Sequence, residues 1–495
     1  MTSVSISPII GRRSRETRSW SVPLVLVSLL AILLRLYRLD AVSLWTDELF
    51  TRFYPHAGLG YLWTEGLRTE PTSPLYYTLV WAVERTLGSS AWALRLPSVA
   101  ASLLGIWLAF RLAGELFGRT APALLAALVL ALAPFNVFVA QEARAYALQG
   151  AALTLALFGF ARLLRGARGA WWLYGVGATL AIWLHPTSVA AVIAFNAAAA
   201  LSAVGRGKLL DRAALLRWIA VNAAVAVLCL PLLPAMLSPT GTVATSWIPA
   251  VTRWSLQRLL GVTLAGPALE QSALRVAEIG LPLLVALFLL PPWRPDRRAA
   301  TVLLLVPGLA FLLMLGISLH RPILLSRTIA WMLVPLAVAL GDVLSRRPKP
   351  LGIVVVAAVA CAGALQAARI DGLKEDWRGF LANLPGLAPP ALVVLAPHTS
   401  PAALAVYAPG AGAPVRMDDG SLAVPETTVI PRLFGTRTIT RADLDAAIAA
   451  GRPVWLIYRR PDYEWMRQAT AGLPPHKLAI QSAPGSNPAM RALSW

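Results

Sequence analysis

The sequence predicts a polytopic α-helical membrane protein that ends in a small α/β domain. The first observation is composition, because 57% of the 495 residues are hydrophobic and only 14% are charged, which is far from a soluble globular average. The second is a series of apolar runs, such as Ala181–Leu201 and Val302–Ile317, that approach or exceed the length needed to cross a bilayer. The third is a change of pattern after residue 370, where short strand-like runs replace the long apolar ones.

About eleven apolar segments of roughly 20 residues are expected to cross the bilayer. The shorter stretch Pro74–Leu87 carries Glu84 and Arg85, so we interpret it as an interfacial or re-entrant helix, and a count of twelve or thirteen spans stays open. No small-residue cleavage site follows the first run, which is therefore expected to stay as a span with Arg35 and Arg38 snorkelling at its outer end. The expected spans lie near residues 20–39, 92–113, 120–140, 146–164, 170–185, 186–204, 215–236, 274–292, 299–318, 323–345 and 350–369.

The basic residues predict the orientation. The net charge of +20 comes from Lys and Arg that gather in short loops between apolar runs, which is typical of cytoplasmic loops and argues against a nucleic-acid partner. The N-terminus is then cytoplasmic, and an odd number of spans puts the C-terminal part outside the cytoplasm. Cys229 and Cys361 both fall within expected spans, which argues against a disulfide or a zinc cluster. The basic loops lie at Arg12–Arg18, Arg111–Arg119, Arg162–Arg168, Arg206–Arg217, Arg294–Arg298 and Arg346–Lys349.

Two domains are therefore predicted, a membrane domain over residues 1–370 and an extracytoplasmic α/β domain over residues 371–495. The second contains strand-like runs at Ala391–Leu395 and Val454–Tyr458 and a helical stretch at Arg441–Ala450, separated by turns rich in proline and glycine.

The pair Asp47-Glu48 is the first candidate for chemistry. It follows the first span in Ser43-Leu44-Trp45-Thr46-Asp47-Glu48-Leu49, where adjacent carboxylates at a membrane surface are costly to place. An alternative is a cap on a helix N-terminus, which Thr46-Asp47-Glu48 would also supply. The position favours chemistry on a substrate whose polar head lies at the membrane surface.

The second candidate is the turn Gln141–Tyr146 between two apolar spans. It places a carboxylate at Glu142, a guanidinium at Arg144 and a phenol at Tyr146 on the outer face. An ion pair between Glu142 and Arg144 that caps the spans is the structural alternative. The functional interpretation is a second acidic group beside a phosphate-binding arginine, since arginine donates two hydrogen bonds to a phosphate.

Two further residues lie near the outer face. His185 closes an apolar run before Pro186, and a lone histidine there is more often interfacial than a ligand. Arg327 suits either a second phosphate contact or a snorkelling anchor. No spacing of histidines resembles a metal site, and no glycine-rich nucleotide motif is present.

In this order the motifs resemble bacterial glycosyltransferase family 39, the membrane enzymes related to protein O-mannosyltransferases and to the aminoarabinose transferase of lipid A. The resemblance covers residues 20–205 well and 299–370 loosely. One departure is Thr72-Ser73-Pro74, where many relatives carry His-Pro-Pro, so the role of that histidine is missing here or has moved to Glu70. The matching motifs are Asp47-Glu48, Pro74–Tyr77, Trp92–Ser98, Gln141–Tyr146 and Ser326-Arg327, and Asp376-Trp377-Arg378 looks like the link to a variable outer domain.

The resemblance implies a C-type membrane glycosyltransferase (GT-C) fold in the bacterial cytoplasmic (inner) membrane and a polyprenyl-phosphate-linked sugar as donor. Transfer to an extracytoplasmic acceptor (lipid, glycan or protein) inverts the anomeric centre, with Asp47 as general base and Glu48 as its orienting residue or alternate. No cofactor is expected with certainty, and help from a divalent metal stays open. The implied sets are catalytic Asp47, Glu48 and Glu142, phosphate-binding Arg144, Tyr146 and Arg327, and substrate-binding Glu70, Tyr76 and His185.

Two other functions stay open. A non-enzymatic flippase or transporter of lipid-linked sugars would need polar residues near the bilayer midplane and often has inverted repeats. The expected spans are poor in such residues. A surface-polysaccharide polymerase or ligase would use similar donors, but it would not require an acidic pair directly after the first span.

Overall fold

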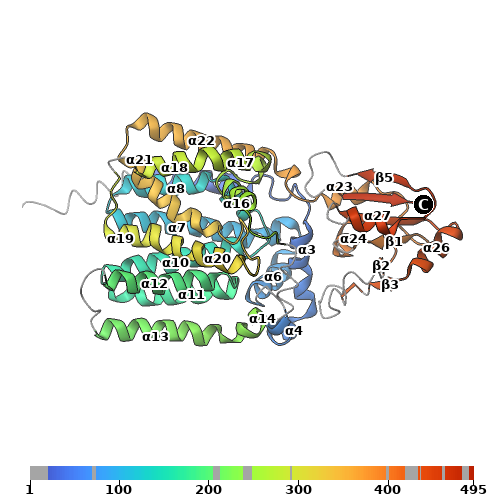
Figure 1. The fold of residues 1–495 in the computed structure, drawn as a ribbon, viewed down its shortest axis with the longest axis horizontal. Coiled ribbons are helices and arrows are strands. Elements are labelled where there is room, and N and C mark those ends of the chain that lie inside the picture. The colour runs from blue at the N-terminus through green and yellow to red at the C-terminus, as the bar shows by residue number, and fades with distance from the viewer. Residues whose placement is uncertain are drawn as a thin grey trace, which may run out of the picture.

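A computed structural model describes residues 21–69, 74–204, 212–237, 248–289, 293–396, 401–417, 433–434, 436–459, 463–481 and 490–495. The long helices lie side by side in a bundle, and an α/β unit lies beyond one end of it (Figure 1). The helices of the bundle are α2 (Ser21–Leu36), α7 (Ala91–Phe117), α8 (Thr120–Leu132), α9 (Pro134–Ala140), α10 (Tyr146–Leu164), α11 (Trp171–Leu184), α12 (Ser188–Val204), α13 (Arg212–Cys229), α14 (Leu233–Leu237), α16 (Arg253–Ala265), α17 (Ala273–Arg275), α18 (Leu281–Leu289), α19 (Arg297–Ala300), α20 (Val306–Ser318), α21 (Leu333–Ser345) and α22 (Lys349–Ala368).

The membrane character predicted from the apolar runs is confirmed. In the described part of the chain, six helices are long and apolar enough to cross a bilayer, and α8 with α9 is a seventh if the bent pair is one span. Shorter apolar helices occupy Val22–Leu36, Trp171–Leu184, Ser188–Ala203 and Ala330–Ser345, close to other expected spans. The exact number of crossings stays a prediction.

The predicted span at 120–140 is broken. Helix α8 ends at Leu132 and α9 begins at Pro134, with a bend of 63° between them. Proline has no amide hydrogen to donate, so carbonyl groups in the last turn of α8 lose their helical partners. The Arg35 side chain replaces those partners, donating to Ala131 O at 3.0 Å and Leu130 O at 3.4 Å. The prediction that Arg35 snorkels is therefore wrong, because its guanidinium is fully buried between helices.

The predicted span at 323–345 starts later than expected. Regular α-helix begins only at Leu333, and residues 319–329 form turns that carry Arg327. Irregular backbone at membrane depth is tolerated where it lines a cavity rather than lipid. This segment lines the cavity described below.

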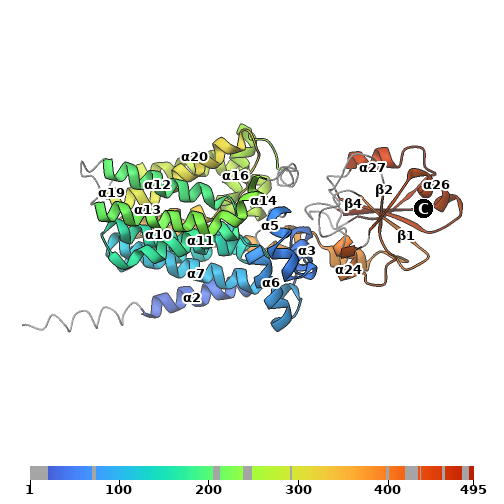
Figure 2. The ribbon, with the colours of Figure 1, turned by 90° about the horizontal axis from the view of Figure 1, so that it is seen from below.

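A cluster of short helices lies at the end of the bundle nearest the α/β unit (Figure 2). The helices are α3 (Thr46–Phe53), α4 (Leu59–Trp63), α5 (Gly66–Thr69) and α6 (Pro74–Leu87). The last has the bounds predicted for an interfacial helix.

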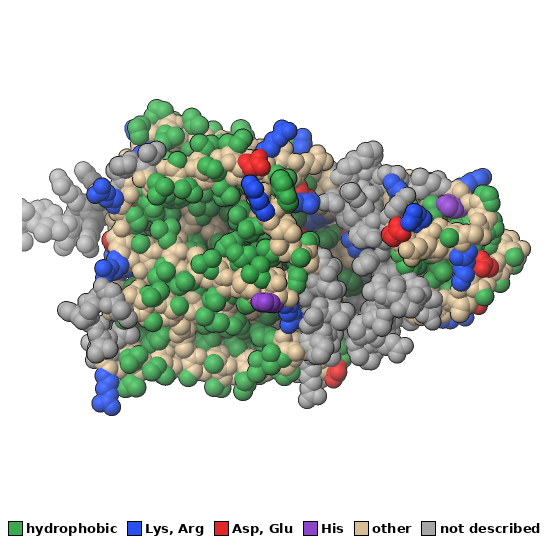
Figure 3. Space-filling model, in the orientation of Figure 1, with side chains coloured by type: hydrophobic (Ala, Val, Ile, Leu, Met, Phe, Trp, Pro, Cys, Tyr) green, Lys and Arg blue, Asp and Glu red, His purple; other side chains and the backbone are tan. Residues whose placement is uncertain are grey.

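The flank of the bundle in Figure 3 is hydrophobic, with charged side chains concentrated toward its two ends. At the end opposite α3, Arg119 and Arg346 pair with the buried Asp342, and Arg165 and Arg298 pair with Glu115. These arginines come from four of the basic loops predicted to be cytoplasmic. The side of the membrane that each end faces stays a prediction, and the predicted loop Arg12–Arg18 lies outside the described residues.

The C-terminal part contains a six-stranded sheet with the order β3-β2-β1-β4-β6-β5. Strands β1 to β4 are parallel, and β6 pairs antiparallel with β4 and β5. The predicted strand-like runs and helix are found as β1, β4 and α26, while the predicted domain boundary at residue 370 stays a prediction. The elements are β1 (Leu392–Leu395), β2 (Val415–Met417), β3 (Arg437–Ile439), β4 (Val454–Arg459), β5 (Lys477–Gln481) and β6 (Met490–Ser494), with helices α23 (Trp377–Ala382), α24 (Pro401–Tyr407), α26 (Arg441–Ala449) and α27 (Tyr463–Ala469).

Alternating residues place the two faces of the sheet in different cores. Val393 and Ile457 belong to the core that continues through α24 into the helical bundle, whereas Val394 and Leu456 pack toward α26 and α27. The unit therefore rests on the end of the bundle that holds α3.

Candidate active site

Helix α3 carries the acidic pair in its first turn. Trp45 has extended backbone geometry and precedes the helix, so Asp47 and Glu48 lie where the helix dipole stabilises negative charge. Glu375, which follows α22, anchors this N-terminus by accepting from Thr46 N at 3.1 Å and from Trp377 Nε1 at 2.6 Å. Because consecutive helical residues point about 100° apart, the two carboxylates face different surroundings.

Glu48 is fully buried in an ion-pair cluster. Arg95 from α7 donates to both of its oxygens, at 2.8 and 2.6 Å, and Lys374 Nζ lies 3.6 Å from Oε1. The backbone N–H of Ala143 donates to the same carboxylate at 2.8 Å. Burial raises the pKa of Glu48, but Arg95 and Lys374 outweigh it and lower this pKa to about 2. The geometry favours the orienting role predicted for Glu48 over that of an alternate base, because both oxygens are occupied.

Arg95 also ties the first outer loop to α7. Its guanidinium donates to the carbonyl oxygens of Leu39 at 2.6 Å, Val42 at 3.1 Å and Ser43 at 3.1 Å. One buried side chain therefore holds the loop that leads into α3 as well as the carboxylate of Glu48.

Asp47 faces a cavity instead. Arg327 Nη1 donates to Asp47 Oδ2 at 2.7 Å, and Arg144 Nη1 donates to the backbone oxygen of Asp47 at 3.2 Å. A quarter of the Asp47 side chain is accessible. Burial raises its pKa, but the charges of Arg327 and Arg144 outweigh burial, so the pKa of Asp47 lies below its ordinary value. Asp47 is thus a carboxylate at neutral pH with an accessible edge.

Tyr146 lies between the two arginines. The guanidinium carbons of Arg327 and Arg144 lie 5.3 and 5.9 Å from the centre of its ring, and Arg327 also lies 5.2 Å from the ring of Trp45. Such cation–π contacts hold guanidinium groups without neutralising them. Arg144 and Tyr146 of this turn and Arg327 therefore converge on Asp47, and their role as a phosphate-binding set stays a prediction.

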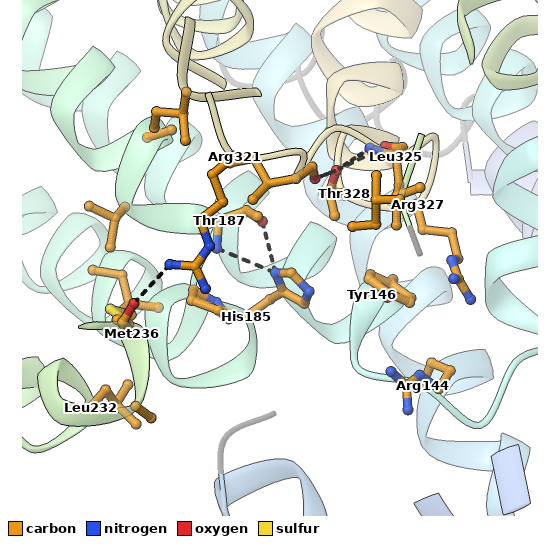
Figure 4. Close-up of a pocket in the computed structure, with 18 of the residues that line it drawn as sticks. Arg144, Tyr146, His185, Thr187, Leu232, Met236, Arg321, Leu325, Arg327 and Thr328 are labelled. Atoms are coloured by element: carbon orange, nitrogen blue, oxygen red, sulfur yellow. Dashed lines mark hydrogen bonds between the residues drawn. The ribbon is translucent and has the colours of Figure 1, made fainter. Parts of the chain in front are cut away.

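The cavity has a volume of about 520 Å³ and extends from Asp47 between helices of the bundle. Its polar end is lined by Asp47 and by two arginines, Arg144 and Arg327. Figure 4 shows the two arginines on either side of Tyr146. The remaining wall comes from α3, α5, α6, α11, α12, α14, α20 and the 323–328 turns, and it is mainly aliphatic apart from the aromatic Phe50, Tyr54 and Tyr77. Arg321 lies in this wall and donates to Met236 O at 3.4 Å. The aliphatic lining residues include Ile182, Val189, Ile193, Leu232, Met236, Leu313, Ile317, Ile323 and Leu325.

His185 lies at the junction of the polar end and the aliphatic wall. It follows α11 with extended geometry, its ring packs on that of Tyr146 at 5.3 Å, and its Nδ1 lies 2.8 Å from Thr187 Oγ1. Burial and the charges of Arg144 and Arg327 lower the pKa of His185 to about 3. The imidazole is therefore neutral at physiological pH.

Glu142 does not pair with Arg144 among the described contacts. Its carboxyl is fully buried, and neither oxygen has a hydrogen-bond partner in the part of the chain that the structure describes. Burial raises the pKa of Glu142, although Lys374 and Arg327 oppose the shift. The structural alternative for this turn, an ion pair between Glu142 and Arg144, is therefore wrong, and Arg144 instead contacts α3, including Thr51 Oγ1 at 3.3 Å.

Two other residues, Glu70 and Tyr76, were predicted to bind the substrate. Tyr76 is buried in α6 and is not among the residues that line the cavity, whereas its neighbour Tyr77 is. Glu70 lies outside the described residues. Within the described ranges, no three acidic, histidine or cysteine side chains are grouped as metal ligands would be.

Lys374, Glu375 and Arg321 were not predicted as site residues, and Arg95 was included only within the motif Trp92–Ser98. Arg95 carried a usable signal, because an arginine inside an otherwise apolar helix needs a buried partner. Lys374 and Glu375 gave no comparable signal, since charged residues after a last span are common.

Comparison with known proteins supports this architecture. Residues 70–234 match a family model described as dolichyl-phosphate-mannose-protein mannosyltransferase. No curated protein sequence matches the chain significantly.

Two solved structures share the fold over nearly the whole chain. The apo crystal structure of ArnT from Cupriavidus metallidurans aligns with a TM-score of 0.61 and 12% identity, covering 97% of this chain and 98% of that one. The structure of the same protein bound to undecaprenyl phosphate gives a TM-score of 0.57 and 13% identity, covering 95% and 97%. Arabinosyltransferase EmbB from Mycobacterium smegmatis aligns less well, with a TM-score of 0.37, 15% identity and coverage of 78% and 43%.

The family model and the shared fold therefore confirm the predicted resemblance: residues 70–234 are similar to the dolichyl-phosphate-mannose-protein mannosyltransferases, and the whole chain has the fold of ArnT.

Proposed function

We propose that the chain transfers a sugar from a polyprenyl-phosphate donor to an acceptor outside the cytoplasm, with Asp47 as the general base. The observation that carries the proposal is the Asp47–Arg327 ion pair, with Arg144 beside it, at the polar end of a mainly aliphatic cavity. A lipid tail suits the aliphatic wall, and a phosphate suits two guanidinium groups with forked donors.

The relative with a bound ligand supports the donor class. ArnT from Cupriavidus metallidurans has been solved with undecaprenyl phosphate, and that chain shares the fold of this one. A lipid carrier confined to the bilayer plane also brings its head group to the depth of Asp47 without a separate binding step for the sugar.

The ion pair suggests how donor binding prepares the base. In the structure Asp47 Oδ2 accepts from Arg327, which weakens it as a proton acceptor. An incoming phosphate competes for the same guanidinium, and Arg144 lies close enough to share the charge. Donor binding then frees the Asp47 carboxylate at the moment when the acceptor must lose a proton.

The transfer is a single displacement. The acceptor oxygen or nitrogen attacks the anomeric carbon, its proton passes to Asp47, and the bond from that carbon to the phosphate oxygen breaks. The polyprenyl phosphate leaves with the electron pair, and Arg144 and Arg327 stabilise the developing charge. Attack from the face opposite the phosphate inverts the anomeric centre. Glu48 orients α3 through Arg95, and Glu142, whose carboxyl is fully buried and is not among the residues that line the cavity, is given no part in this step.

The proposed location is the cytoplasmic membrane of a bacterium, with the N-terminus in the cytoplasm and the α/β unit outside. A transporter of lipid-linked sugars is disfavoured, because Asp47, Arg144 and Arg327 gather at one end of the bundle rather than at its middle. A polysaccharide polymerase or ligase differs only in its acceptor.

Transfer by the purified protein in liposomes tests the proposal. Undecaprenyl-phosphate-linked hexoses and pentoses are offered with envelope extract as acceptor, and both free undecaprenyl phosphate and labelled product are measured. The expected result is donor cleavage coupled to product formation with at least one sugar. Transfer from nucleotide sugars alone, or movement of intact donor across the bilayer without cleavage, would contradict it. Glu65→Gln, which alters an exposed carboxylate in the same outer loop, serves as control.

A further inference from the structure

His185 is held by hydrogen bonds that fix the position of its proton. The backbone N–H of Thr187 donates to His185 Nδ1 at 3.3 Å, and the Thr187 hydroxyl lies 2.8 Å from the same nitrogen. A backbone N–H can only donate, so Nδ1 must accept and carries no hydrogen. In a neutral imidazole the hydrogen is then on Nε2.

Gln149 strengthens this assignment from a second helix. Its Nε2 donates to Thr187 Oγ1 at 3.2 Å and to Ser188 Oγ at 2.9 Å, and its side chain is almost wholly buried. A hydroxyl that accepts from Gln149 keeps its own hydrogen to donate to His185. The order of donation therefore runs from Gln149 through Thr187 to Nδ1, which leaves Nε2 as the outward donor.

The ring lies among the cavity residues. His185 and Thr187 both line the cavity, and in Figure 4 the imidazole lies on the side of Tyr146, with Nδ1 facing Thr187. No hydrogen bond of Nε2 is found within the described residues, and this nitrogen is not among the buried atoms that lack a partner. Within those residues the Nε2–H group therefore has no hydrogen-bond partner and is not fully buried, so it is available to donate to a ligand.

We propose that His185 Nε2–H donates a hydrogen bond to an oxygen of the donor lipid's head group, a phosphate oxygen or a sugar hydroxyl, and that Thr187 and Gln149 are the residues that position it. The proposal rests on the proposed function for the identity of the ligand. In the tautomer that these hydrogen bonds fix, Nε2 is a donor and Nδ1 is already an acceptor, so His185 is not proposed as the base of the reaction.

The neutral state has a clear physical source. The ring is partly buried, and the guanidinium groups of Arg144 in the 141–146 turn and Arg327 in the 323–328 turns repel a third positive charge. These same groups supply the charge for the phosphate. A neutral N–H donor beside them requires an acceptor in one direction but adds no charge. Such a directional hydrogen bond distinguishes one head group from another.

Side-chain replacements that mimic one ring nitrogen at a time provide the test. A glutamine amide nitrogen reaches the position of Nε2, whereas an asparagine amide nitrogen reaches only that of Nδ1. His185→Gln is expected to retain donor affinity, while His185→Asn and His185→Ala raise the apparent donor KM about tenfold, the effect of one lost hydrogen bond. His320→Gln, an exposed histidine of the outer 319–322 turn, is the matched control.

The positioning residues have their own test. Thr187→Val keeps the shape but removes the hydroxyl, so donor KM should rise severalfold, and Thr187→Ser should restore it. Acceptor KM should not change. Equal losses in Thr187→Val and Thr187→Ser, or equal donor KM in His185→Gln and His185→Asn, would overturn the proposal.

Direct binding measurements distinguish whether the acceptor oxygen belongs to the phosphate or to the sugar. If His185→Asn weakens binding of undecaprenyl phosphate itself, the partner is a phosphate oxygen, and if it weakens only the glycosylated donor, the partner is a sugar hydroxyl. Unchanged affinity for both overturns the proposal.

The tautomer can be measured without any substrate. Protein labelled with ¹⁵N-histidine, compared with His185→Gln to assign the signals, should show a protonated Nε2 and an unprotonated Nδ1. A protonated Nδ1 overturns the inference even if the enzyme is active. Absence of transfer with the expected tautomer would instead count against the proposed function.

Discussion

Replacing Glu48 by glutamine should show whether this carboxylate of the acidic pair has a structural or a catalytic role. The substitution keeps the size of the side chain but removes the charge that Arg95 and Lys374 share. All three side chains are at most 2% exposed, so water cannot replace the lost partner. We expect Glu48→Gln to lower the free energy of unfolding strongly, whereas Asp47→Asn should leave it nearly unchanged.

The magnitude follows from two independent considerations. Removing one partner of a buried ion pair costs about 3–5 kcal/mol, because the other charge is left uncompensated. Lowering the pKa of Glu48 from 4.5 to about 2 corresponds to about 3 kcal/mol of stabilisation at neutral pH. Both point to a loss of about 3 kcal/mol or more, which is large beside the typical effect of a surface substitution.

The pH dependence has a definite sign. The folded-state pKa of Glu48 lies below the unfolded value of 4.5, so its stabilisation is fully present above pH 4.5 and is lost as the pH falls toward 2. The difference in stability between the wild-type protein and Glu48→Gln should therefore be constant near neutrality and shrink through that acidic window.

The assay is unfolding of the purified proteins in mixed detergent micelles, followed by helical circular dichroism, with Glu65→Gln as the exposed control. Wild-type stability in Glu48→Gln with lost activity would refute the reasoning and return Glu48 to the role of base.

Three further predictions concern the phosphate contact, the α/β unit and the topology. Arg144→Ala should lower kcat/KM for the lipid donor about 10²–10³-fold, and Arg144→Lys by less but still clearly, because lysine keeps the charge without the fork; unchanged donor kinetics in both would move the phosphate contact to Arg327. Arg459→Met should lower both stability and turnover, because Arg459 of β4 pairs with the buried Glu375 that anchors α3, whereas Lys477→Met, which removes an exposed charge from the same sheet, should change neither. In a background without native cysteines, Thr64→Cys should react with an impermeant thiol reagent in intact cells and Arg165→Cys only after lysis, and the reverse pattern would invert the proposed orientation.

The helical framework could be predicted because repeated apolar runs of bilayer length are typical of membrane-spanning helices and rare in soluble domains. The break in the third span also had a visible cause in Pro134. The sequence did not indicate which group replaces the lost partners of those carbonyl groups, since Arg35 lies about a hundred residues earlier in the chain. The sequence suggested a snorkelling anchor, and only the packing of α2 against α8 shows that this guanidinium stays inside.

The candidate site was predicted in outline for a similar reason. Asp47, Arg144 and Arg327 lie next to spans and on the same predicted face, so their convergence followed from the topology. Which of the two adjacent carboxylates faces the cavity could not be read from the chain, because that depends on where Arg95 lies. The alternative of a Glu142–Arg144 ion pair is wrong, because Arg144 donates to acceptors on α3 instead.

Turnover by Asp47→Asn tests the central claim most directly. The variant keeps the shape of the side chain and one acceptor for Arg327, so it should fold and bind undecaprenyl phosphate like the wild-type protein. Without a base, its rate of sugar transfer should fall about 10²–10⁴-fold in liposomes. Near-wild-type transfer by folded, inserted Asp47→Asn would remove Asp47 from the mechanism and contradict the proposed active site.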